Sequence, residues 1–312
     1  MDQGPAVLLR AIGLPRGGAG RGPADLAVLS GSALLVLGDR KSAASGLLSV
    51  MAGRSSTPSS RVLVGSRKLP VHTSEAAGYL GYVPSDTGCP DEVTPRAHLS
   101  LVASAIGLGG RKASRTISEL LEWCLPRGRA DSQWVELDEE ERTATSLAAA
   151  LLDNPQVLVA DRVMPPGLLE RLVELKALGK ALVLRAVAAD GIPPAADRIA
   201  LCDAEGIATV VRRSDLEAVC RRMGTVEVGF YPSLPRSTME ELPGARDLQA
   251  RGAGWVFGHA DTASALVHLS GLARANARAI VSLRIYPPTP VALARRLVPV
   301  EDGESTLFGE GD

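Results

Sequence analysis

The sequence predicts an α/β fold in which helices cover a mainly parallel sheet. Apolar runs occur at residues 33–37, 79–83, 157–160, 181–185 and 198–202, and helical stretches lie between them. Strands of about four to six residues that alternate with helices are typical of parallel sheets. With 312 residues, the chain exceeds one typical domain, so we expect a larger and a smaller domain.

Composition narrows the classes of function. Hydrophobic residues make up 46% of the chain and aromatic residues only 3%, which predicts a core of Ala, Val and Leu. Lys and Arg number 34 against 35 Asp and Glu, a balance that argues against nucleic-acid binding. The four histidines show no metal-ligand spacing, so we expect no metal site.

No apolar stretch approaches the roughly 18–20 residues that span a bilayer, and the first residues lack the pattern of a signal peptide. We therefore expect a cytoplasmic protein. It would reach a membrane only through a partner.

Residues 33–53 have the pattern of a strand, a loop and a helix. A phosphate-binding loop reads G-x-x-x-x-G-K-[ST], in which backbone N–H groups and the lysine bind phosphate and the hydroxyl binds Mg²⁺. Gly38 matches the first glycine, and Ser45 matches the final hydroxyl. The second glycine and the lysine are replaced by Ala43 and Ala44.

Lys41 is the one nearby candidate for a displaced lysine. The glycine expected about six residues before it would then be Leu35, inside the predicted strand. Residues 33–53 alone are therefore explained by a buried strand and an amphipathic helix joined by a polar turn.

Three further segments follow in a characteristic order. They are GYLGYVPS at residues 78–85, LDEEERTATSLAAALLDNPQVLVAD at 137–161, and GKALVLRAVAADGIPPAADRIALCDAEGI at 179–207. In order and spacing, the chain resembles the nucleotide-binding subunit of an ABC transporter over about residues 6–299. The resemblance implies a P-loop NTPase-like ABC ATPase fold with a helical subdomain, expected at about residues 91–136.

The same resemblance places the functional positions of the family, and most of them are substituted. Ser85 takes the place of the Q-loop glutamine, and Val187 that of the switch histidine. Asp161 matches the Walker B aspartate, but Arg162 follows it where the family has a catalytic glutamate. An arginine stays protonated at ordinary pH and cannot act as a general base.

The signature segment is also altered. Leu137 is followed by Asp138, Glu139 and Glu140, where the family has a serine and paired glycines that bind the γ-phosphate held by the opposite subunit. Carboxylates there would repel a phosphate, although an acidic first turn also suits an ordinary helix dipole.

The last part of the chain resembles the small C-terminal domain of drug-resistance ABC ATPases of the daunorubicin-exporter type. VEVGF at residues 226–230, a helical stretch at 263–275 and IVSLRIYPPTPVALARRLV at 280–298 carry this resemblance. We expect an ABC ATPase-like domain at residues 1–220, a small α+β domain at 221–300 and a disordered acidic tail at 301–312.

These substitutions predict a pseudo-ATPase with no catalytic residues, in which Mg-ATP binding is weak or absent. One hypothesis is a non-catalytic subunit of an ABC-type exporter that pairs with a permease, a competent ABC ATPase or a second copy of itself. Another is a soluble regulatory protein on a decayed scaffold. A third is a weak, unconventional ATPase that uses Lys41 and Asp161.

Overall fold

The structure is a computed structural model, and it describes residues 7–15, 24–38, 43–55, 57–69, 78–187, 193–202, 204–215 and 224–286. The chain divides after Val210 into two compact units. The boundary predicted at residue 220, the segment 287–298 and the tail 301–312 lie outside the described residues. No helix of the described residues combines the length and the hydropathy that crossing a bilayer requires.

A six-stranded sheet forms the centre of the first unit. Its order is β10-β9-β3-β8-β7-β6, and β3 pairs in parallel with β8 and β9, as β7 does with β6 and β8. The strands are β3 (Ala33–Leu37), β6 (Leu80–Val83), β7 (Val157–Val163), β8 (Ala181–Ala186), β9 (Arg198–Cys202) and β10 (Ile207–Arg212). Most residues of β3, β7, β8 and β9 are buried, and these strands read as nearly continuous apolar runs, as strands covered on both faces do.

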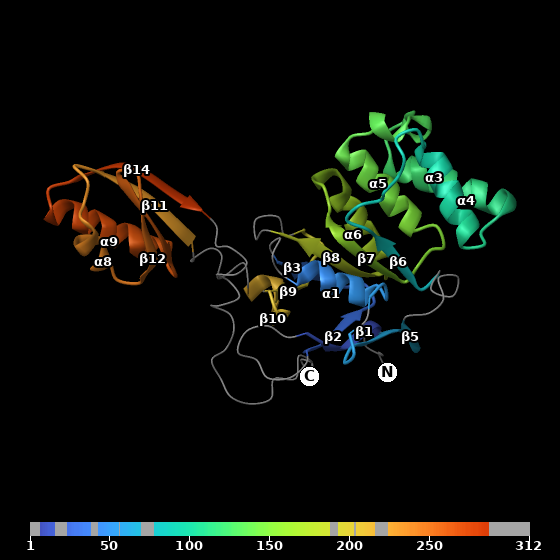
Figure 1. Cartoon of the computed structure of the whole chain (residues 1–312), viewed down its shortest axis with the longest axis horizontal. Helices are drawn as coiled ribbons and strands as arrows, with labels where there is room; N and C mark the ends of the chain where they lie inside the picture. The colour runs from blue at the N-terminus through green and yellow to red at the C-terminus, as the bar shows by residue number, and fades with distance from the viewer. Residues whose placement is uncertain are drawn as a thin grey trace. The chain divides into compact units, whose positions relative to one another are not determined.

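A second sheet, which the sequence analysis did not predict, lies below the first in Figure 1. It has the order β2-β1-β4-β5 and is antiparallel, with strands β1 (Val7–Leu14), β2 (Ala24–Leu29), β4 (Arg61–Val64) and β5 (Arg67–Leu69). Helix α1 (Ala44–Met51) packs between the two sheets. Leu34 and Val36 of β3 belong to the core cluster that fills this space.

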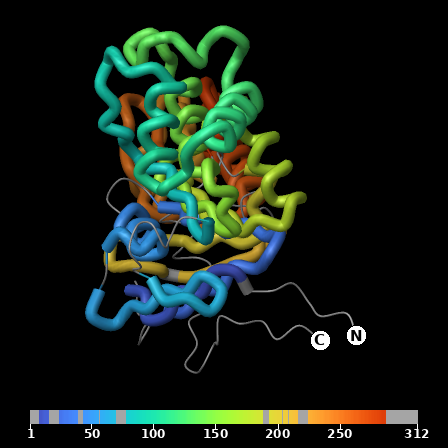
Figure 2. Tube along the Cα trace, turned by 90° about the vertical axis from the view of Figure 1, so that its right-hand side faces the viewer, coloured from blue at the N-terminus to red at the C-terminus, as the bar shows by residue number. Residues whose placement is uncertain are grey.

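The helical segment predicted at residues 91–136 contains α3 (Pro95–Ala105), α4 (Gly110–Cys124) and two short 3-10 turns. Helix α5 (Glu139–Ala150) follows it, and residues 95–150 are called the helical segment below. Thr94 caps α3 by accepting the Ala97 N–H at 3.2 Å. Ile117, Leu121 and Leu125 are buried along one side of α4, as the helical spacing predicts. These helices group together beyond β6 and rise above the sheets in Figure 2.

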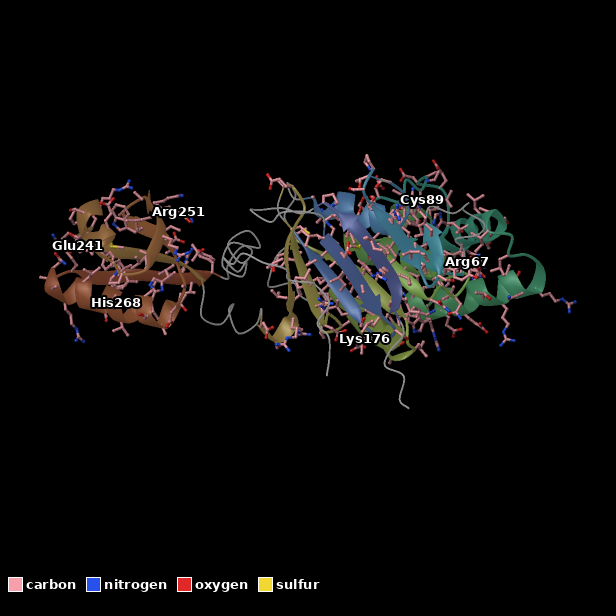
Figure 3. The ribbon with its side chains drawn as sticks, turned by 90° about the horizontal axis from the view of Figure 1, so that it is seen from below. Arg67, Cys89, Lys176, Glu241, Arg251 and His268 are labelled. Carbon is pink, nitrogen blue, oxygen red and sulfur yellow. The ribbon has the colours of Figure 1, made fainter. Side chains whose placement is uncertain are left out.

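Helix α6 (Leu169–Ala177) returns the chain from β7 to β8. Lys176, labelled in Figure 3, lies 2.5 Å from Asp197 Oδ1 and donates to the carbonyl of Ala195 at 3.1 Å. Asp197 in turn accepts the Ala33 N–H at 2.8 Å. This chain of contacts fixes α6 relative to the start of β3.

The second unit is a four-stranded antiparallel sheet of order β12-β13-β11-β14 with two helices. Its elements follow the β-α-β-β-α-β pattern: β11 (Gly224–Tyr231), α8 (Arg236–Glu240), β12 (Ala245–Arg251), β13 (Gly254–His259), α9 (Thr262–Ala275) and β14 (Ala279–Tyr286). Phe230, Trp255, Phe257 and Leu269 are buried in its own core.

Candidate functional site

The candidate site lies where β3, β7 and β8 end, together with the loop after β6. In open parallel sheets, ligands bind outside the carboxyl ends of the strands. Gly38 follows β3, and Val187 follows β8 with an exposed side chain. Asp161 and Arg162 lie in β7, near its carboxyl end, and Ser85 lies just beyond β6.

Asp161 is the centre of a small polar cluster. Its side chain is 3% exposed. Ser45 in the first turn of α1 donates to Asp161 Oδ2 at 2.6 Å, and the Tyr82 hydroxyl lies 3.4 Å from the same oxygen. Arg185 Nη1 donates to Asp161 Oδ1 at 2.8 Å. Both carboxylate oxygens are therefore engaged by protein groups.

Tyr82 completes this cluster as a neutral donor. Burial raises the pKa of its hydroxyl, and the nearby Asp161 carboxylate raises it further. The hydroxyl therefore stays protonated at neutral pH and can donate a hydrogen bond to Asp161.

Arg162 connects three segments. Its Nε donates to the carbonyl of Ser85 and its Nη1 to Thr143 Oγ1, both at 3.2 Å, and Nη2 lies 3.4 Å from Glu139 Oε1. The Arg162 side chain is only 15% exposed. At the position where the resemblance places a catalytic carboxylate, the guanidinium acts as a hydrogen-bond donor to neighbouring segments.

The loop that would hold phosphate is described only in part. Ala44 is fully buried as the first residue of α1, and the Gly38 N–H donates to the carbonyl of Ala186 at 3.1 Å. Lys41 lies among residues 39–42, outside the described residues.

The acidic signature segment forms a well-capped helix start. Asp138 caps α5 by accepting the Glu141 N–H at 2.8 Å, and Glu141 accepts the Asp138 N–H at 2.9 Å. Leu137 is buried, whereas Glu139 and Glu140 are exposed in the first turn. These contacts are those of an ordinary acidic helix N-terminus.

Three residues of this site escaped the sequence reasoning: Tyr82, Thr143 and Arg185. Arg185 had a visible signal, because it is the one charged residue in the apolar run of β8. A charge in a strand that is buried on both faces usually has a partner. Tyr82 and Thr143 gave no comparable signal.

A groove of about 600 Å³ lies between the sheet and the helical segment. Its walls come from the end of α1, from β6 and the loop after it, and from α3 and α5. Its lining includes the apolar Leu80, Val102 and Ile106 and the charged Arg54 and Asp86.

Comparison with known proteins gives the following relatives. No protein-family model matches the chain. Proteins named Nod factor export ATP-binding protein I are similar to it: one from a Rhizobium species is 27% identical over 164 residues, covering 50% of this chain and 54% of the relative. The protein from Rhizobium etli is 24% identical over 224 residues, covering 70% of each chain. The match therefore spans about half of the first relative.

Solved structures agree on the fold. An ATP-binding subunit of an ABC transporter superposes with a TM-score of 0.55 at 18% identity, covering 67% of this chain and 91% of that one. A nucleotide-free ATP-binding cassette gives 0.57 at 17% identity, covering 68% and 94%. The fold of the first unit is that of an ABC ATPase domain, and the predicted fold class is confirmed.

Proposed function

We propose that this chain is a catalytically inactive subunit of an ABC-type exporter. The relatives and the structural neighbours support the ATP-binding subunits of ABC transporters as its family. It would contribute shape and contacts, while any ATP hydrolysis would occur in a competent partner ATPase. The observation that carries this proposal is the environment of Arg162.

A general base must accept a proton from the attacking water. Arg162 stands at the corresponding position, and its guanidinium stays protonated at every ordinary pH. Its contacts to Ser85, Thr143 and Glu139 also hold it in place as a donor. Loss of a general base typically lowers a rate by about 10²–10⁴-fold.

The surroundings of Asp161 also support a subunit without catalysis, because they disfavour binding of Mg²⁺. The family uses this carboxylate on the Mg²⁺ side of the nucleotide, and the residues present fit a dication poorly. Asp161 Oδ1 already accepts from Arg185, so an arriving Mg²⁺ would meet a fixed positive charge 2.8 Å from its ligand oxygen. We therefore propose that Arg185 supplies the positive charge beside Asp161.

The exporter partner is proposed from the relatives and from the groove. The relatives' name specifies export and ATP binding, which we carry to this chain as a proposal. The resemblance implies that the helical subdomain and the Q-loop contact the membrane subunit. The groove lies between the sheet and the helical segment, and Pro84 and Asp86 beside the Q-loop position line it. The protein would then lie at the inner face of the membrane through a permease, paired with a second copy or with a competent ABC ATPase.

Phosphate release from Mg-ATP tests the proposal directly. The unaltered protein should release phosphate no faster than an Asp161→Asn variant purified in the same way, because neither has a functional site. A rate above that of the variant by more than about tenfold would overturn the proposal. Co-purification of the tagged protein with a membrane permease, identified by mass spectrometry, would test the exporter assignment separately.

A soluble regulatory protein on the same scaffold is the alternative. The acidic start of α5 favours it, because the Asp138, Glu139 and Glu140 carboxylates would repel the γ-phosphate of a nucleotide shared between two subunits. A nucleotide-independent monomer that co-purifies with no permease would support this alternative over the exporter subunit.

A further inference from the structure

Arg162 links the loop after β6 to helix α5. The resemblance assigns the position of Ser85 to contact with Mg²⁺ and water, and the start of α5 to contact with the γ-phosphate held by the opposite subunit. In this chain, the guanidinium donates to the Ser85 carbonyl and to Thr143 on α5, each at 3.2 Å. A protein side chain therefore makes the link between sheet, loop and helix.

A second bridge joins the helical segment to α6, the helix that connects β7 and β8. Trp123 Nε1 near the end of α4 donates to Glu174 Oε2 on α6 at 2.8 Å. Arg171 of α6 pairs with Glu174 Oε1 at 2.9 Å, and its guanidinium carbon lies 5.2 Å from the centre of the Trp123 ring. These contacts make one polar cluster between α4 and α6.

The two bridges use different elements on both sides. One runs from β7 to the first turns of α5, and the other runs from α6 to the end of α4. Two separate attachments restrict rotation of one body against another more than one attachment does. The guanidinium of Arg162 is well suited to this task, because its planar fork binds several acceptors in fixed geometry.

We infer that Arg162 and Trp123 hold the helical segment, residues 95–150, in one arrangement against the sheet without nucleotide. The groove lined by β6, α3 and α5 would then keep its shape whether or not ATP is present. This inference rests on the proposed function, since it explains how a subunit without nucleotide chemistry could present a constant surface to a partner.

Hydrogen exchange followed by mass spectrometry on the full chain tests the inference. Arg162→Gln removes the charge and the fork, and Trp123→Phe keeps an aromatic ring but removes the N–H donor. Arg115→Gln is the matched control, because the pairing of Arg115 among the described residues is with Glu119 along α4 and its side chain is 81% exposed. Residues 33–37 of β3, which are buried in the same unit, serve as the internal reference for its global stability.

Without nucleotide, Arg162→Gln should raise exchange in residues 139–147 by about tenfold or more, and leave the reference peptides unchanged. Trp123→Phe should raise exchange of residues 117–125, and Arg115→Gln should change none of these regions. Unchanged exchange at 139–147 in Arg162→Gln would overturn the inference, as would an equal rise in the reference peptides.

An arm with Mg-ATP separates this inference from the proposed function. If the bridges hold the arrangement, added Mg-ATP should leave the exchange of the unaltered protein unchanged in the same peptides. Protection by Mg-ATP in the unaltered protein would count against a nucleotide-independent subunit. The arm without nucleotide would still decide whether Arg162 is the bridge.

Discussion

Arg185 and Asp161 form an ion pair, Nη1 to Oδ1 at 2.8 Å, between the neighbouring parallel strands β8 and β7. Their side chains are 16% and 3% exposed. The pair occupies the side of the sheet on which Ser45 also reaches Asp161. An arginine in β8 thus ties Asp161, to which the resemblance gives the Walker B position, to the protein itself.

Removal of Asp161 should destabilise the protein. Asp161→Ala leaves the Arg185 charge largely buried without its partner, so we expect a loss of roughly 3 kcal/mol in the free energy of unfolding. Urea denaturation measures the loss. The double variant Asp161→Ala, Arg185→Met should recover much of it, because no uncompensated charge remains. A loss below about 1 kcal/mol for Asp161→Ala would show that the pair is not structurally important.

Gly81 of β6 should tolerate no side chain. A Cβ at this position would lie 2.2 Å from the carbonyl oxygen of Ala150 at the end of α5 and 2.9 Å from Pro155 Cγ. Backbone must therefore shift, and Gly81→Ala should lower the free energy of unfolding by roughly 1–3 kcal/mol.

Gly46 provides the matched control for this change. It lies exposed in α1, and a Cβ there meets nothing within 4 Å. Gly46→Ala should stabilise the protein by up to about 1 kcal/mol through helix propensity. Thermal melts of the two variants should thus move in opposite directions, and a shift in the same direction would contradict the close approach of β6 and α5.

Glu141 should make the helical segment sensitive to acid. Arg129 donates to both of its carboxylate oxygens, at 2.5 and 2.7 Å, and this pairing holds the pKa of Glu141 below its ordinary value. A lowered folded-state pKa gives stability that is present above the unfolded-state pKa, about 4.3, and is lost as the pH falls through the folded-state value.

Comparison with Glu141→Gln isolates this contribution. The unaltered protein should be more stable than the variant at about pH 7, and the difference should shrink as the pH falls below about 4.3. Other carboxylates titrate in both proteins and cancel. Urea unfolding at several pH values gives the difference, and a constant difference down to about pH 3 would refute the pairing as the cause.

The parallel sheet could be predicted from the sequence, whereas the antiparallel sheet could not. Strands such as β3 and β8 are continuous apolar runs, because both of their faces are covered. By contrast, β2 alternates buried and half-buried residues and follows a glycine-rich stretch, and β5 has only three residues. Such short, half-exposed strands carry little periodic signal.

The positions in the candidate site that follow from motif spacing along the chain could be predicted from the sequence. Gly38, Ser45 and Asp161 were placed by motif spacing, and the structure brings Ser45 and Asp161 within hydrogen-bond distance. The partners of Arg162 and Asp161 come from distant segments, Ser85, Thr143 and Arg185. Which side chain of another strand or helix faces a given residue is decided by tertiary packing, so local sequence could not specify it.

Calorimetric titration with Mg-ATP tests the central claim most directly. The unaltered protein and an Ala44→Lys variant, which restores the lysine position, are compared after circular dichroism shows that the variant folds, because Ala44 is buried. We predict no heat of binding for the unaltered protein up to millimolar Mg-ATP. Saturable heat at micromolar Mg-ATP in the unaltered protein would contradict the account of an inactive, nucleotide-independent subunit.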